Sequence, residues 1–190
     1  MCSSMTFNKF GWEYISNIIS QEEANSVMEN NKILLNDLEP CYNHERGKVI
    51  MKYAPSSCVF IMKRIQPILE KIVGEELLPT YWFMTTYYNK SFMSRHKDKQ
   101  TCEISVSMNL ESSVDWELKL TDLQGINRKL ITPVGSGVAY MGYDLYHWRS
   151  PLNCDGDKKY TQLFLHFVKK HGEYSIYAYD NDQECFDLLN

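Results

Sequence analysis

The most constraining feature of this sequence is a strict alternation of apolar and polar side chains over residues 104–110. The apolar positions are Ile104, Val106, Met108 and Leu110, and the polar positions between them are Ser105, Ser107 and Asn109. Successive side chains of a β-strand point to opposite faces of the sheet, so a period of two predicts a strand with one buried face. The chain is therefore expected to contain at least one sheet with an apolar face.

Several further segments have the composition of strands. From residue 81 onward the chain is rich in β-branched and aromatic residues, and the segments expected to be strands are 82–88, 115–121, 129–132, 138–141, 160–168 and 174–179. Short strands that are separated by Gly, Asn and Asp turns, without helices between them, favour an antiparallel sandwich or jelly roll over a parallel α/β sheet.

Two helices are predicted in the first third of the chain. Residues 20–23 read Ser-Gln-Glu-Glu, the spacing of a capping box, which predicts a helix that runs to about Asn30. A second helix is expected to begin near Pro55 and to end at Gly74, with a kink at Pro67. The predicted fold class is therefore mainly β with N-terminal helices (α+β), in which the helices buttress one sheet.

Length and composition indicate one globular domain. The chain has 190 residues, of which 44% are hydrophobic and 23% are charged, and domains typically contain about 100–200 residues. A single domain over residues 1–190 is expected, with a helical front at about 1–78 and a β-rich core at about 79–180.

Charge and hydropathy limit the partners. Twenty basic residues against 24 acidic ones give a net charge of −4, which argues against a nucleic-acid partner. No apolar run approaches the roughly 18 residues of a membrane span, and the N-terminus lacks the basic patch and apolar stretch of a secretory signal. A cytoplasmic location without a membrane partner is expected, and the sequence does not indicate an oligomeric state.

The clearest chemical signal is the motif His96-Lys97-Asp98. Side chains two positions apart on an extended segment point to the same side, so His96 and Asp98 can face one ion. His147 follows after several predicted strands and is the candidate third ligand. Two histidines and one carboxylate are the ligand set of non-haem Fe(II) oxygenases, and zinc hydrolases use similar ligands.

The order of these features resembles the 2-oxoglutarate- and Fe(II)-dependent dioxygenases, in the branch that includes prolyl 4-hydroxylase-like proteins. The resemblance covers residues 78–168, in the order strand, His-x-Asp, several strands, the Pro-Val-Gly-Ser-Gly turn at 133–137, His147, a basic residue and a strand. It implies a double-stranded β-helix, which is a form of jelly roll, with His96, Asp98 and His147 as the iron ligands. It also implies 2-oxoglutarate and O2 as cosubstrates, with ascorbate as a further candidate cofactor.

Relatives bind the distal carboxylate of 2-oxoglutarate with a basic residue that follows the second histidine, and three candidates remain open. Lys158 lies 11 positions after His147, close to the family spacing. Lys159 shares strand parity with the more apolar face of 160–168, and Arg149 offers a guanidinium suited to a bidentate contact. Tyr87 and Tyr88 lie on the strand that leads to the first histidine, where relatives often place a tyrosine that hydrogen-bonds the cosubstrate. One of the two is expected to pack in the core, and Tyr88 is the candidate for the hydrogen bond.

The expected reaction is hydroxylation of a C–H bond in a peptide or small-molecule substrate, and a peptidyl proline is favoured by analogy. One alternative is a metal-binding jelly roll without turnover that serves as a recognition module. A zinc hydrolase ranks lower because the sequence offers no H-E-x-x-H motif or other acidic residue placed as a general base. The remaining histidines, His44, His166 and His171, have no partner at ligand spacing and are expected to be structural.

Overall fold

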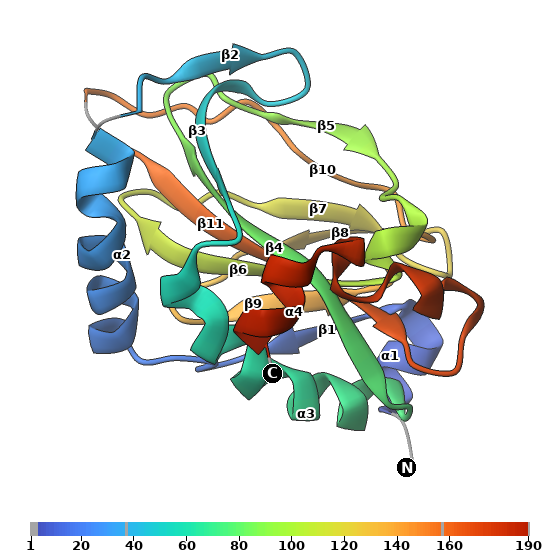
Figure 1. Ribbon diagram of the computed structural model, residues 1–190. Helices are drawn as coiled ribbons and strands as arrows, with labels where there is room; N and C mark the ends of the chain where they lie inside the picture. The colour runs from blue at the N-terminus through green and yellow to red at the C-terminus, as the bar shows by residue number, and fades with distance from the viewer. Residues whose placement is uncertain (1–3, 37, 157, 190) are drawn as a thin grey trace.

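The strands of the protein form two antiparallel sheets, seen in a computed structural model that describes residues 4–36, 38–156 and 158–189 (Figure 1). The larger sheet has the strand order β1-β9-β6-β11-β4-β3-β2 and the smaller one the order β5-β10-β7-β8. The strands of the larger sheet are β1 (Trp12–Ile15), β9 (Gly137–Tyr140), β6 (Ile104–Ser112), β11 (Tyr160–Lys169), β4 (Leu77–Tyr87), β3 (Gly47–Tyr53) and β2 (Cys41–Asn43). Those of the smaller sheet are β5 (Met93–His96), β10 (His147–Arg149), β7 (Leu118–Thr121) and β8 (Asn127–Leu130).

Helices accompany the sheets mainly at the two ends of the chain. The α-helices are α1 (Met5–Phe10), α2 (Gln21–Asn36), α3 (Val59–Val73) and α4 (Gln183–Leu189), and the 3-10 helices are η1 (Ser56–Cys58), η2 (Gln100–Cys102) and η3 (Glu173–Asn181). In the described part of the chain, no helix has both the length and the apolarity that a membrane span requires.

The predicted helix ends rest on recognisable caps. Before α2, the Ser20 hydroxyl accepts from the Glu23 N–H at 3.1 Å and the Glu23 carboxylate accepts from the Ser20 N–H at 2.9 Å, which is the predicted capping box. The α2 helix extends beyond the expected end at Asn30. The α3 helix continues through Pro67 and ends at Gly74, whose φ of 85° lies in the left-handed region that favours glycine.

The two faces of the larger sheet pack against different layers. Trp82, Leu163 and Leu165 belong to a core that also contains the buried residues of α3. Phe83 and Phe164, on the opposite face of the same strands, pack with residues of the smaller sheet such as Leu118. Alternate positions of β4 and β11 therefore serve two separate interiors.

A β-rich antiparallel fold with helices is confirmed, but two details of the prediction need correction. The first third of the chain is less helical than expected, because it also supplies β1, β2 and β3 to the larger sheet. Two of these strands have only four and three residues, too few for the alternation to be visible. Residues 174–179, expected to be a strand, lie in the 3-10 helix η3. The preceding strand β11 already pairs with β4 and β6 on its two edges, so this segment has no free edge beside it.

The polar face of β6 also differs from expectation. Ser105, Ser107 and Asn109 are buried rather than solvent-facing. They lie on the side of the larger sheet that faces the interior between the sheets, so β6 is covered on both faces. This interior contains the candidate site.

Candidate metal centre

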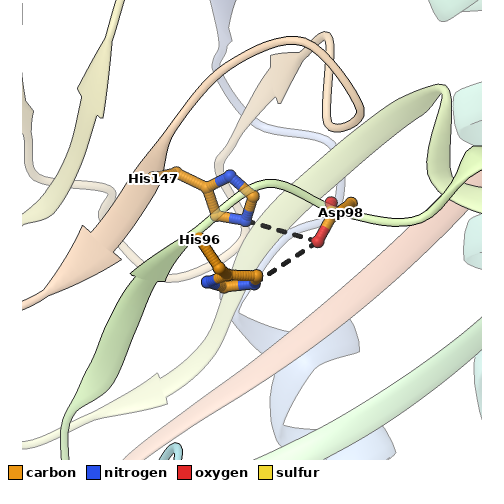
Figure 2. Close-up of side chains that lie close together, drawn as sticks. All are labelled: His96, Asp98 and His147. Carbon is orange, nitrogen blue, oxygen red and sulfur yellow. Dashed lines mark ion pairs between the residues drawn. The ribbon is translucent and has the colours of Figure 1, made fainter.

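Strand pairing brings the two candidate histidines together. In the smaller sheet β5 runs antiparallel to β10, and His96 is the register partner of His147. The centres of the two imidazole rings are 4.3 Å apart. Asp98 lies two residues beyond the end of β5, where its backbone N–H donates to the Gly142 carbonyl at 2.9 Å. Figure 2 shows the carboxylate turned toward both rings.

The three groups converge through atoms that carry lone pairs. Asp98 Oδ1 is 3.4 Å from Nε2 of His96 and 3.4 Å from Nε2 of His147. Nδ1 of His96 lies 2.7 Å from the Ser94 carbonyl oxygen, and Nδ1 of His147 lies 3.0 Å from that of Leu145. A carbonyl can only accept, so both imidazoles carry a proton on Nδ1 and, when neutral, present a bare Nε2. Two bare nitrogens and a carboxylate oxygen would repel one another without a cation, so the donor set fits a divalent metal.

The electrostatics of the carboxylate agree with this arrangement. Burial alone would raise the pKa of Asp98, but its contacts with His147 and His96, whose Nε2 atoms can donate to it only in the protonated imidazolium form, hold that pKa well below its ordinary value. Burial opposes the charged form of His96 as well, and its contact with Asp98 nevertheless raises the pKa of this histidine. The carboxylate is therefore ionised at neutral pH and available as a ligand.

A second layer of residues holds Asp98 in place. The Ser105 hydroxyl donates to Asp98 Oδ2 at 3.0 Å and lies 2.9 Å from Nδ1 of His166. Since the hydroxyl proton is used on the carboxylate, Nδ1 of His166 must be the donor to Ser105. Gly142 closes the other side: a Cβ at this position would lie 2.5 Å from both Asp98 Oδ2 and the Ser105 hydroxyl oxygen. Such partners orient a ligand and raise metal affinity.

A second possible group consists of Asp98, Cys102 and His166, whose ligand atoms also lie within 4.8 Å of one another. It shares Asp98 with the first group. Burial raises the pKa of the Cys102 thiol to about 12, so the thiol is protonated and a poor ligand at neutral pH. The two histidines facing Asp98 are the better metal centre.

The candidate centre opens into a cavity of about 570 Å³ between the sheets. Aromatic rings of Tyr53, Tyr81, Phe83 and Phe164 line it together with His166. The cavity therefore combines an apolar wall with the candidate metal ligands. The charged residues that line it are Glu45, Arg46, Lys97, Asp98 and Lys99.

The predicted cosubstrate residues do not line this cavity. Lys158 is exposed, and Lys159 is half-exposed and pairs with Glu111 at 3.1 Å. Arg149 is buried but is not among the residues that line the cavity, and its guanidinium carbon is 4.8 Å from the ring centre of Trp116.

Tyr88 also stays outside the cavity, because the parity of β4 turns the neighbouring Tyr87 inward instead. The Tyr87 hydroxyl accepts from Arg46 Nη1 at 3.0 Å. Of the predicted residues, only the candidate metal ligands are therefore brought together.

Sequence reasoning missed two residues that line the cavity, Arg46 and His166. Strand parity contained the signal for His166, because Phe164 and His166 share one face of β11. The more apolar face, with Leu163 and Leu165, was expected to point inward to the site but packs toward the helices. For Arg46 the sequence held no signal, because its position depends on a turn between two short strands.

Comparisons with known proteins give a match in structure only. No protein-family model matches the chain, and no curated protein is similar to it in sequence. A prolyl-4-hydroxylase from Pseudomonas putida is 14% identical, with a TM-score of 0.66 over 86% of this chain and 95% of that chain. The epimerase SnoN of nogalamycin biosynthesis, in complex with Fe3+, alpha ketoglutarate and nogalamycin RO, is 9% identical, with a TM-score of 0.70 over 86% and 80%. A prolyl hydroxylase from Trichoplax adhaerens, in complex with a hypoxia inducible factor peptide fragment, is 13% identical, with a TM-score of 0.65 over 85% and 86%.

These similarities define the class of fold. The chain has the fold of the 2-oxoglutarate- and Fe(II)-dependent oxygenases, with prolyl hydroxylases among its structural neighbours. The resemblance that the sequence indicates is thereby confirmed at the level of the fold.

Proposed function

We propose that this protein is an Fe(II)- and 2-oxoglutarate-dependent oxygenase that hydroxylates a C–H bond of a peptide or small molecule. The observation that carries the proposal is the convergence of His96, Asp98 and His147, through atoms with free lone pairs, at the wall of a cavity. Two imidazoles and one carboxylate leave coordination positions open on iron, as oxygenases require. The presence of Fe3+ and alpha ketoglutarate in one structural neighbour supports the same conclusion.

Within this proposal the three residues hold iron. When bound, iron together with 2-oxoglutarate and O2 would supply the oxidising power for hydroxylation, and the cosubstrate would leave as succinate and CO2. The chain supplies position: the carbonyls of Ser94 and Leu145 fix the two imidazoles, and Ser105 fixes the carboxylate.

The cavity walls supply the remaining functions. The rings of Tyr81, Phe83 and Phe164 form an apolar surface that limits the access of water to the reacting carbon. Lys97 and Lys99 place positive charge at the cavity, which attracts an anionic cosubstrate although the whole chain is acidic.

The proposal extends to the domain organisation and to the class of substrate. We infer one domain over residues 1–190, built as a double-stranded β-helix in which the two sheets enclose the cavity. The first candidate substrate is a prolyl residue of a peptide, because prolyl hydroxylases are among the structural neighbours. A small molecule is the second, since the neighbour SnoN is in complex with nogalamycin RO.

The experiment is an anaerobic titration of the protein with Fe(II) and then 2-oxoglutarate, followed by admission of O2. We expect a metal-to-ligand absorption band on addition of 2-oxoglutarate, and release of succinate that depends on iron. The assay is run with and without ascorbate, and a proline-containing peptide is examined by mass spectrometry for the gain of one oxygen atom.

Matched variants test the ligand assignment. His96→Ala and Asp98→Ala are expected to lose both the band and succinate release while remaining folded. His171→Ala is the control, because this exposed histidine contacts only Glu76, at 3.4 Å, among the ion pairs of the described residues. A protein that binds the metal but releases no succinate would instead be the recognition module without turnover. Undiminished turnover in His96→Ala or Asp98→Ala would show that the ligands are wrong.

A further inference from the structure

Arg46 reaches from a surface turn into the interior of the protein. It lies in the turn between β2 and β3, the hairpin at the top of Figure 1. Its guanidinium carbon is 5.3 Å from the ring centre of Phe83 and 5.4 Å from that of Phe164. Nη1 donates to the Tyr87 hydroxyl at 3.0 Å. The cation is therefore held over the aromatic wall of the cavity, on the side of the hairpin.

The guanidinium is charged and has unused donors. Burial alone would lower the pKa of Arg46, but contact with Tyr87 and the charge of Asp98 raise it above its ordinary value. A guanidinium has five N–H donors in a planar fork. Among the described residues, Tyr87 is the one hydrogen-bond acceptor found for it. The remaining donors are available to a ligand in the cavity.

Arg46 lies in the same cavity as the candidate metal ligands, and its charge interacts with those of Asp98 and His96. A keto acid with a second carboxylate, bound at the metal through one end, needs a cation for its other end inside this cavity. The candidates from the sequence are less suited, since Lys158 is exposed, Lys159 pairs with Glu111, and Arg149 lies outside the cavity lining.

We propose that Arg46, assisted by the Tyr87 hydroxyl, binds the distal carboxylate of 2-oxoglutarate and thereby selects a dicarboxylic keto acid. The planar fork matches a carboxylate in two parallel hydrogen bonds, which a lysine cannot make. The hydroxyl of Tyr87, which is buried behind the residues that line the cavity, accepts from Arg46 Nη1 and so holds the guanidinium in position for this contact. This inference rests on the proposed function, and it places the selective contact on the β2–β3 hairpin rather than on β11.

The test compares two keto acids of equal chain length on the Zn(II)-loaded protein by isothermal titration calorimetry. They are 2-oxoglutarate and 2-oxopentanoate, in which a methyl group replaces the distal carboxylate. Charged hydrogen bonds contribute about 1.5–3 kcal/mol, so we expect Arg46→Met to weaken 2-oxoglutarate binding about 10- to 100-fold. The same variant leaves 2-oxopentanoate binding within about twofold, because that probe makes no contact with a cation.

Two further variants keep the test decisive. Tyr87→Phe preserves the ring and removes only the hydroxyl, and it is expected to weaken 2-oxoglutarate binding about two- to tenfold. Lys159→Met removes an exposed cation and should change neither affinity. If Arg46→Met still prefers 2-oxoglutarate as strongly as the unaltered protein does, or if Lys159→Met loses the preference, the assignment of Arg46 is overturned.

The failure of this inference is distinguishable from failure of the proposed function. If the Zn(II)-loaded protein binds neither keto acid, or binds both equally, both proposals are overturned. If it prefers 2-oxoglutarate and that preference survives in Arg46→Met, the proposed function stands and only the contact with Arg46 is wrong.

Discussion

The two faces of the larger sheet are equally buried but chemically different. On β11, Leu163 and Leu165 face the helices and are fully buried, whereas Gln162 and His166 face the interior between the sheets and are 0% and 3% exposed. Among the described residues, buried side-chain atoms without a hydrogen-bond partner gather between the two sheets. They include Thr85 Oγ1, Tyr140 Oη, Arg149 Nε, Gln162 Oε1 and His166 Nε2.

The helix face of the larger sheet mainly stabilises the fold, whereas the cavity face carries the groups that are available for chemistry. A buried polar group without a partner costs about 1–3 kcal/mol, so the cavity face contributes less to the stability of the fold than the apolar helix face does. Natural proteins break the rules of packing mainly where function requires it. The face that contributes less to stability is the one that carries the candidate site.

Truncation on the helix face should give the largest loss of stability. Leu165→Ala removes a fully buried side chain, and we expect the free energy of unfolding to fall by about 2–5 kcal/mol. Chemical denaturation measures this loss, and Ile176→Ala, at a position that is 69% exposed, serves as the near-neutral control. Metal affinity of the folded variant should be unchanged. A loss below about 1 kcal/mol would contradict the assignment of this face to the stabilising core.

The cavity face should make stability depend on pH through His166. Burial lowers the pKa of His166 from 6.5 to about 4. Between these values the unfolded chain binds more protons than the folded one, so stability is lost as pH falls from 6.5 through 4. The full loss amounts to about 3 kcal/mol. Denaturation curves of the unaltered protein and His166→Asn at pH 7 and pH 4 isolate this contribution. Parallel pH dependences of the two proteins would show that His166 is not buried as a neutral imidazole.

A smaller effect is expected at the support of the carboxylate. Ser105→Ala removes the hydrogen bond to Asp98 Oδ2, and loss of an outer partner of a metal ligand typically weakens metal binding about 10- to 100-fold. Titration with Co(II) measures the affinity. Ser107→Ala is the matched control on the same face of β6, since its hydroxyl accepts from Gln162 instead. If the two variants bound Co(II) with equal affinity, Ser105 would have no role in supporting the metal centre.

The smallest effect is expected far from the cavity, at the capping box of α2. Ser20→Ala leaves the Glu23 N–H without its acceptor and should lower the free energy of unfolding by about 1 kcal/mol. Metal binding should not change. Thermal or chemical denaturation measures the loss, and a change in metal affinity would mean that the two faces of the sheet are coupled more closely than their packing indicates.

The sequence predicted the parts of the fold that depend on local patterns. The capping box at Ser20, the helix end at Gly74 and the long strand β6 follow from residues within a few positions of one another. The strands β1 and β2 could not be predicted, because they are too short to show a period and are held by distant partners. The 3-10 helix η3 was missed because its composition resembles a strand and only the occupied edges of β11 exclude one.

The residues of the candidate site also divide into those that local sequence patterns predict and those that depend on distant parts of the chain. His96 and Asp98 were predictable from their spacing, and His147 from its place after the turn at 133–137. Arg46 was not, because its side chain reaches the cavity only after the β2–β3 hairpin has paired with the edge of the larger sheet. His166 was misjudged because the sequence shows which face of a strand is more apolar, but not which of two buried faces contains the chemistry.

The close approach at Gly142 has a consequence for how this loop can vary. Position 142 has room only for the hydrogen atom of glycine, so even the methyl group of alanine would clash with the Asp98 carboxylate. A mutation at a residue that never meets the metal would thus misalign a ligand directly. We therefore expect a substitution of Gly142 to disturb the metal centre as strongly as a substitution of Asp98.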